Sequence, residues 1–286
     1  MSDRGVELST RHAQISPSAP LAAVRDIGVL AKLMAPSPRH MQFIQAVTGA
    51  STLYAIFWLD VSSWWWMTAL VGYFLVNCIG QSVMMHRALA HRAVRFPKPV
   101  EYAFSWLGML GGAGSAIGFA AMHRAHHAQS DTETDPHALD DHGWLLLFSL
   151  YEYDFNPIYV RDLLRDRVHL FMHLYYAPLI LAWAIALYLV DPLLFVFAYA
   201  VPAFLNITIS NLGNIIGHEF GYRSHETRDD STNNWLLALL TWGEGWHNNH
   251  HAKPLRANFQ ERWWEIDPGG MIINMMARFG LATPRL

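Results

Sequence analysis

Histidine is the residue type whose spacing in this chain points most directly to chemistry. Eight of the 16 histidines fall into three short boxes, and a ninth candidate, His218, stands apart from them. The boxes are His86-x4-His91, His123-x2-His126-His127 and His247-x2-His250-His251. Packing and surface positions account for dispersed histidines, but three tight boxes exceed what packing requires. We interpret them as ligands of a metal cluster.

The spacing within each box suggests how the rings approach a metal. In His-x2-His-His, positions i, i+3 and i+4 lie on one face of a helix, so three imidazoles can converge on a metal site from one turn. In the first box, positions i and i+5 diverge by ~140° on an ideal helix, which suits a helix end that faces two separate metal ions. His218 shares a helical face with Asn214, although it can equally be a boundary histidine beside Gly217.

Imidazole binds zinc, copper, iron and nickel, so the ligand type alone does not select the metal. A structural zinc ion takes four ligands, far fewer than the histidines available here. The single cysteine, Cys78, excludes a Cys-x2-Cys zinc site and a thiolate iron–sulfur cluster. Two metal ions with four or five nitrogens each fit better, and iron is the redox-active choice that explains a position at a membrane.

Ligand histidines need hydrogen-bond partners on their outer ring nitrogens. Three acidic residues lie within ten residues of a box and are candidates for that role: Asp131, Asp135 and Glu244. Each of them could instead be a solvated loop carboxylate.

Composition places the site at a membrane, because 52% of the residues are hydrophobic and only 15% are charged. A bilayer core requires ~20 mostly apolar residues as a helix, and four segments approach this length. They are roughly 41–59, 64–85, 172–190 and 192–217. Very short turns at 60–63 and 191–192 group them into two hairpins.

The basic residues indicate the orientation of these hairpins. All 20 lysines and arginines lie before the first span, between residues 86 and 170, or after residue 217. Positive charge marks the cytoplasmic side, so both termini and all nine histidines are predicted to lie there. A fifth apolar stretch, 100–121, would separate the first two boxes if it crossed the bilayer, and we therefore expect a re-entrant or interfacial helix.

The predicted protein is all-α and integral to the membrane. Four transmembrane helices in two hairpins carry a cytoplasmic helical cap formed by about residues 86–171 and 218–286. Residues 1–40 are expected to be a mobile cytoplasmic tail and 41–286 a single domain, with no chemical role for His12 or His40. The net charge of −3 carries no nucleic-acid signature.

Several stretches together resemble the membrane-bound fatty acid desaturases of the stearoyl-CoA or Δ9 type. The resemblance covers about residues 45–260. The matching stretches are His86 to Arg92, His123 to His127 leading to Asp135-Pro136-His137, Asn214 to His218 with Gly221-Tyr222-Arg223, and Gly243 to His251.

The resemblance implies a membrane stem of four helices and a cytosolic cap that holds a di-iron centre. The implied iron ligands are His86, His91, His123, His126, His127, His218, His247, His250 and His251. Asn214 is the implied water-mediated metal contact. The implied reaction is the O2-dependent removal of two hydrogens from adjacent methylenes of a fatty acyl chain, carried by CoA or by a lipid, to give a cis double bond.

Channel and partner predictions follow from the same comparison. Leu70 and Phe74 lie on one face of the second apolar span, where Phe74 could cap a substrate channel, although core packing is the more usual explanation of such a pattern. Many acyl-CoA members carry polar and aromatic residues before the second box, whereas this chain has small and apolar residues at 114–122. The sequence Asp267-Pro268-Gly269-Gly270 lacks the histidine of a cytochrome b5 haem motif.

A separate electron donor is therefore expected: a ferredoxin, a rubredoxin, or cytochrome b5 with a reductase. The short outer turns fit a bacterial inner membrane, and an internal eukaryotic membrane is the alternative. Two other functions share features with this pattern. A membrane di-iron hydroxylase would share the site but give an alcohol. A histidine-based metal transporter would place ionisable residues within the spans, which here contain essentially none.

Overall fold

Helices make up most of the regular structure in the computed structural model, which describes residues 35–136, 143–149 and 156–285. Within these ranges the only sheet is a two-stranded antiparallel one, in which β1 (Val94–Arg95) pairs with β2 (Thr283–Pro284). The mainly helical prediction is confirmed. Almost all of the predicted tail, and with it His12, lies outside the described residues.

The first predicted hairpin is built from α3 and a longer helix that follows it. Helix α3 (Pro38–Trp58) begins at the N-cap Ser37. After a short turn, α4 (Ser63–Tyr73) runs without a break into η1 (Phe74–Ala90), whose turns are wider than those of an α-helix. The first histidine box therefore lies at the far end of a helix of 28 residues.

The second predicted hairpin is less regular. Helix α8 (Arg167–Leu174) is followed by α9 (Tyr176–Val190), and the two are bent by 74°. After the turn at Asp191, α10 (Pro192–Leu194), η5 (Phe195–Ala200) and α11 (Val201–Glu219) form one continuous helix.

Hydropathy supports two or three of the four expected spans. The helices Ser63–Ala90 and Pro192–Glu219 are long and apolar enough to cross a membrane, and α8 with α9 counts as a third if the bent pair is one span. Helix α3 has 21 residues, enough to cross ~30 Å, but it is not apolar enough to count as a candidate membrane span. The fourth span stays a prediction.

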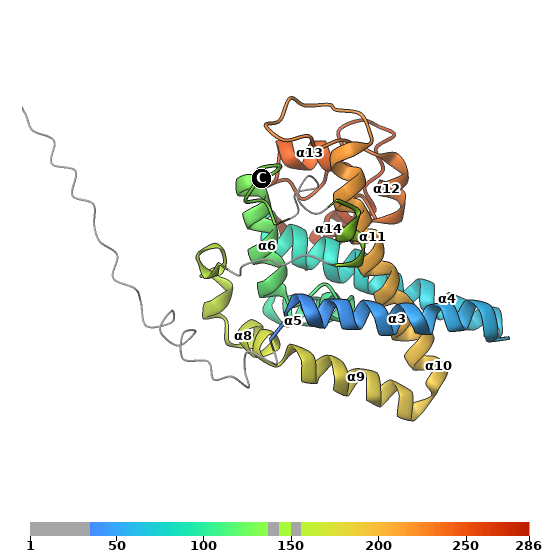
Figure 1. The fold of residues 1–286 in the computed structure, drawn as a ribbon. Helices are drawn as coiled ribbons and strands as arrows, with labels where there is room; N and C mark the ends of the chain where they lie inside the picture. Colours follow the sequence, from blue (N-terminus) through green and yellow to red (C-terminus); the bar gives the residue numbers. More distant parts are fainter. Residues whose placement is uncertain (1–34, 137–142, 150–155, 286) are drawn as a thin grey trace, which may run out of the picture.

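Shorter helices gather at one end of the long ones (Figure 1). They are α5 (Lys98–Leu110), α6 (Ala116–Gln129), η2 (Gly143–Phe148), η3 (Pro157–Val160), η4 (Leu163–Arg165), α12 (Trp235–Leu240), α13 (His247–Ala252) and α14 (Pro268–Arg278). Helices α6, α11 and α13, which carry seven of the nine candidate ligands, meet in this part of the molecule.

The fifth apolar stretch is not one continuous helix. It breaks between α5 and α6, where Gly112 and Gly114 adopt φ of 79° and 90°, a conformation that favours glycine. Helix α5 packs so closely on η1 that a Cβ at Gly80 would lie 2.2 Å from the Gly108 nitrogen. Helix α6 then restarts at Ser115, whose hydroxyl accepts a hydrogen bond from the Gly118 amide, and it carries the second histidine box.

One hydrophobic core joins these elements. Met84 of η1, Met109 of α5, Ile117 of α6, Tyr176 of α9 and Ile273 of α14 are all fully buried in the same cluster. Because close-packed interiors resist displacement, this core holds the histidine-bearing ends of η1 and α6 in a defined position.

Candidate metal centre

The structure gathers all nine candidate histidines into two adjacent groups, within each of which one ring nitrogen per residue lies within 4.8 Å of the others. The first group, called here the five-histidine group, contains His86, His91, His123, His127 and His250. The second, the four-histidine group, contains His126, His218, His247 and His251. The arrangement of five and four nitrogens matches the expectation of two metal ions.

Each His-x2-His-His box is divided between the two groups. In α6, His123 and His127 belong to the five-histidine group, whereas His126 belongs to the four-histidine group. Along an α-helix, positions i and i+4 lie ~40° apart while i+3 and i+4 lie ~100° apart, so one turn reaches two neighbouring sites. The expectation that three rings of one box converge on one site is therefore wrong.

Helix α13 has the same pattern with the groups exchanged. His247 and His251 belong to the four-histidine group, and His250 belongs to the five-histidine group. The second and third boxes therefore each contribute two rings to one group and one ring to the other.

The first box also differs from expectation, because His86 and His91 both belong to the five-histidine group. Their separation on an ideal α-helix does not apply here. The His91 amide donates to the His86 carbonyl at 3.0 Å, a hydrogen bond between residues i and i+5 that is typical of a wide π-type turn. This turn places the two residues above one another, so the predicted approach to two separate ions is wrong.

The ring nitrogens face one another at distances typical of ligands around an ion. His91 Nε2 lies 3.1 Å from His86 Nε2 and 2.7 Å from His123 Nε2. His250 Nε2 lies 3.1 Å from His86 Nε2 and 2.9 Å from His127 Nε2. An imidazole nitrogen binds at about 2.0–2.1 Å from a first-row metal such as zinc, so ligand atoms around one ion are separated by about 3 Å.

His218 lies at the end of α11, with its Nε2 atom 3.0 Å from that of His247. This contact places it in the four-histidine group and not at an isolated helix boundary. Asn214, one turn earlier on α11, lines the cavity beside the centre together with His247.

All three acidic residues singled out in the sequence contact outer ring nitrogens. The His86 Nδ1 atom lies 2.5 Å from Glu244. The corresponding distance is 2.9 Å from His126 to Asp135 and 3.1 Å from His218 to Asp131. Each carboxylate therefore orients one ring, as expected of the groups that surround a metal site.

A fourth carboxylate, Asp229, was not predicted from the sequence. It contacts the His251 Nδ1 atom at 2.9 Å. Asp229 lies 22 residues before His251 in a stretch that carries several charges, so neither its spacing nor its surroundings mark it. Only the folding of this segment over α13 brings the two side chains together.

The protonation of these rings favours metal binding. Burial lowers the pKa of several imidazoles well below the usual value, and the neighbouring histidines lower it further. These imidazoles belong to His91, His123, His127, His247 and His250. Burial likewise lowers the pKa of His251 to about 4, although Asp229 opposes the shift. These rings are therefore neutral near pH 7, the form that binds a metal.

The hydrogen bonds also decide which ring nitrogen is available. A carboxylate only accepts hydrogen bonds, so the Nδ1 atoms that face Glu244 and Asp229 carry the proton. The Nε2 atoms of His86 and His251 then present lone pairs to the interior of the centre. His251 Nε2 is buried without a hydrogen-bond partner among the described residues. A bound cation would satisfy these lone pairs, so the residues fit two metal ions.

A buried arginine supports the centre from behind. Arg87, fully buried, donates hydrogen bonds to Glu244 and to both oxygens of Asp267. Its guanidinium also lies 3.9 Å from the centre of the Phe259 ring. Asp267 caps α14 as well, by accepting from the Gly270 amide. The segment Asp267-Pro268-Gly269-Gly270, which lacks a haem-binding histidine, therefore has a structural role. Asp267 holds Arg87, and Arg87 in turn holds Glu244, the carboxylate that contacts His86.

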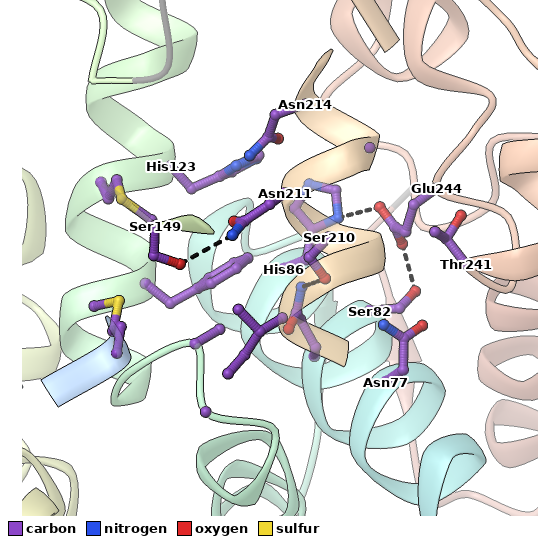
Figure 2. A pocket seen from close by; sticks show the side chains of 18 of the residues that line it. Asn77, Ser82, His86, His123, Ser149, Ser210, Asn211, Asn214, Thr241 and Glu244 are labelled. Atoms are coloured by element: carbon purple, nitrogen blue, oxygen red, sulfur yellow. Dashed lines mark hydrogen bonds and ion pairs between the residues drawn. The ribbon is translucent and has the colours of Figure 1, made fainter. Parts of the chain in front are cut away.

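A cavity borders the centre on the side of the long helices (Figure 2). His86, His123 and His247 line it from the metal side, and Phe119 and Met122 of α6 form part of its apolar wall. Figure 2 also shows polar side chains from η1 and α11 around it, including Asn77 and Ser210.

Neither of the two residues proposed for a channel lines this cavity. The lining contains neither Leu70 nor Phe74. The side chain of Leu70 is 53% exposed, and the ring of Phe74 packs edge-on against Trp242 with 5.1 Å between ring centres. A channel role for these residues stays a prediction.

Comparison with known proteins assigns the chain to a family. The sequence model of the family described as fatty acid desaturase matches residues 62–267, which is more than half of the chain. The chain belongs to the fatty acid desaturase family. This confirms the resemblance inferred from the histidine boxes, and it makes the protein an oxidoreductase of fatty acyl chains.

Several curated desaturases are similar over most of their length. The sn-1 stearoyl-lipid 9-desaturase of Anabaena variabilis is 35% identical over 225 residues, covering 75% of this chain and 81% of the relative. The acyl-CoA C20 Delta5-desaturase of Anemone leveillei is 34% identical over 255 residues, covering 85% and 80%. The sn-2 palmitoyl-lipid 9-desaturase of a Nostoc species is 32% identical over 240 residues, covering 78% and 83%.

The outer carboxylates of this desaturase provide a direct test of the four-histidine group. Replacing Asp229 by alanine removes the acceptor of His251 Nδ1–H, and loss of such a partner typically weakens metal affinity by about 10–100-fold. We expect this loss of affinity only for the metal bound by the four-histidine group. It is measured by titrating iron into the metal-free protein. Asp230→Ala is the matched control, because that neighbouring side chain is 86% exposed. Equal affinities for the two variants would contradict the assigned role of Asp229.

Proposed function

We propose that this desaturase introduces a cis double bond at the Δ9 position of a saturated fatty acyl chain. The nine histidines of the two groups would hold two iron ions, and Asn214 would contact the iron of the four-histidine group through a water molecule. The observation that carries the proposal is the arrangement of five and four inward-facing ring nitrogens directly beside a cavity.

The chemistry of the substrate explains why metals are needed. Acid–base groups accelerate reactions by about 10²–10⁴-fold and do not break an unactivated C–H bond. Iron bound by the histidines would supply the oxidising power of O2 for removing the hydrogens. The overall reaction consumes one O2, two protons, two electrons from a donor and two hydrogens from the fatty acyl chain, and it gives two water molecules and the alkene.

The protein's own residues would position the chain and keep water away. His86, His123 and His247 form the boundary between the metal centre and the cavity, so a chain bound there would lie next to the site of oxidation. Phe119 and Met122 provide apolar contact on one side. Holding the reacting carbons in one orientation is what selects a single pair of methylenes.

The Δ9 position is proposed from the relatives, since the Anabaena and Nostoc proteins named above are described as stearoyl-lipid and palmitoyl-lipid 9-desaturases. The orientation is proposed from the basic residues, with both termini and the metal centre on the cytoplasmic side of a bacterial inner membrane. Electrons would come from a separate donor: a ferredoxin, a rubredoxin, or cytochrome b5 with a reductase.

A direct test is product analysis. The protein is expressed, together with a reductase and a ferredoxin, in a host that makes saturated fatty acyl chains. The fatty acids of that host are then analysed by gas chromatography and mass spectrometry. We expect new monounsaturated chains with the double bond between carbons 9 and 10. A hydroxylated product would favour the hydroxylase alternative, and another bond position would contradict the Δ9 assignment. Unchanged fatty acids with an active donor would contradict desaturation.

A further inference from the structure

A second hollow lies outside the metal centre, between α3 and α9. Its volume is about 450 Å³, within the range of ~300–1,000 Å³ that is usual for small-molecule sites. Phe43, Ile44 and Val47 line it from α3, and Ile180, Ala184 and Tyr188 line it from α9. We call this hollow the α3–α9 groove.

The groove suits an apolar chain and not a polar ligand. Apart from His40 at one end, its lining is aliphatic and aromatic, with the hydroxyls of Thr48 and of tyrosines as the other polar groups. The Thr48 hydroxyl already donates to the Ile44 carbonyl at 2.6 Å. Along α9 the lining extends from Tyr176 to Tyr188, about 18 Å at the helical rise of 1.5 Å per residue. The groove is therefore elongated along α9, as an extended hydrocarbon chain is.

The groove and the metal-side cavity lie on either side of the first turns of α3. Met41 lines the metal-side cavity, whereas the neighbouring His40 and Ile44 line the groove. The separating layer is thin, because a Cβ at Gly112, which lines the metal-side cavity, would lie 3.1 Å from Cγ2 of Ile44. The start of α3 therefore divides two adjacent hollows.

The residues at this dividing point are polar. His40 Nδ1 lies 2.7 Å from the Ser37 hydroxyl, and Arg39 between them is exposed. A hydroxyl, an imidazole and a guanidinium are groups that bind esters and phosphates. They contrast with the apolar walls of the groove that begins beside them.

We propose that the α3–α9 groove holds the second acyl chain of a diacyl glycerolipid whose first chain is the substrate in the metal-side cavity. The two chains of such a lipid leave neighbouring glycerol carbons, so they can separate around the start of α3. The glycerol esters and the headgroup then lie at Ser37, Arg39 and His40. The inference rests on the proposed desaturation and names its substrate class: a lipid-linked chain and not an acyl-CoA.

Photolabelling tests the groove without any need for turnover. The full-length protein is placed in phosphatidylcholine vesicles that contain a phosphatidylcholine with a diazirine on its sn-2 chain, and the adducts are mapped by mass spectrometry. We expect labelling of α3 and α9 at the groove and its loss in Ala184→Trp, in which the indole fills the groove. Leu189→Trp, at a 76% exposed position outside the lining, is expected to label as the wild type does. Equal labelling of the two variants, or a crosslink to a second copy of the chain, would overturn the proposal.

Turnover then separates this inference from the proposed function. We compare 1-stearoyl-2-palmitoyl phosphatidylcholine, 1-stearoyl lysophosphatidylcholine and stearoyl-CoA with the same donor. The wild type is expected to favour the diacyl lipid at least tenfold in kcat/KM. Ala184→Trp is expected to lose that preference, whereas Leu189→Trp is expected to keep it. Conversion of stearoyl-CoA alone would overturn the inference and leave desaturation standing. Conversion of none of the three would count against both.

Discussion

Replacing His126 or its neighbour His127 by alanine is expected to remove a different iron in each case. His126 belongs to the four-histidine group and His127 to the five-histidine group, although they are adjacent in sequence. Each variant is expected to retain one of the two irons, and desaturation is expected to fall to background because the reaction requires both. Iron per chain is measured by mass spectrometry after purification, and folding by size-exclusion chromatography.

Double variants make this prediction sharper. His126→Ala with His251→Ala affects only the four-histidine group, so it should lose no more iron than His126→Ala alone. His126→Ala with His127→Ala should lose both irons. His225→Ala is the matched control, since His225 contacts Glu261 and belongs to neither group. If each His-x2-His-His box held a single iron, the two double variants would give the opposite result.

The second large effect is expected for stability. Replacing Arg87 by methionine leaves the fully buried carboxylate of Asp267 and the partly buried carboxylate of Glu244 without their cation. Breaking a buried ion pair in this way typically costs about 3–5 kcal/mol, a large part of the stability of a typical domain. We expect a markedly lower midpoint of thermal unfolding in detergent, together with weaker iron binding, because Glu244 also orients His86.

Arg92→Met is the control for this prediction. Arg92 pairs with Asp162, but its side chain is 59% exposed, and exposed pairs contribute about 0–1 kcal/mol. Its unfolding midpoint should lie close to that of the wild type. An Arg87 variant as stable as the Arg92 variant would show that the buried network does not support the centre.

Local spacing was a reliable guide to which residues belong to the site. The nine histidines are brought together as expected, because their number and clustering demand a common ligand whatever the path of the chain. That Asp131, Asp135 and Glu244 would accept hydrogen bonds from ligand rings could also be anticipated, because each lies close to a box. Their partners could not, since only Asp135 contacts a ring of its neighbouring box, whereas Asp131 contacts His218 and Glu244 contacts His86. Asp229 could not be anticipated at all, because it lies 22 residues from its partner His251 and no box stands beside it.

The division of the histidines between two groups was not predictable from the boxes. It depends on where α6 and α13 stand relative to one another, and on the wide turn that stacks His86 on His91. The same limit applies to Leu70, which shares a helical face with Phe74 in sequence but is largely exposed in the fold. Periodicity describes one helix at a time and contains no information about its neighbours.

The sequence by itself determined that this protein is a mainly helical, membrane-associated desaturase with a histidine-rich centre, because ligand type, ligand number and apolar runs are local properties. Only the tertiary structure decided which rings gather in each group, which carboxylate contacts His86, His126, His218 and His251, and how Arg87 and Asp267 support the centre. It also decided that two hollows adjoin the start of α3. These features arise from contacts between segments far apart in the chain, whose geometry is set by packing and not by spacing.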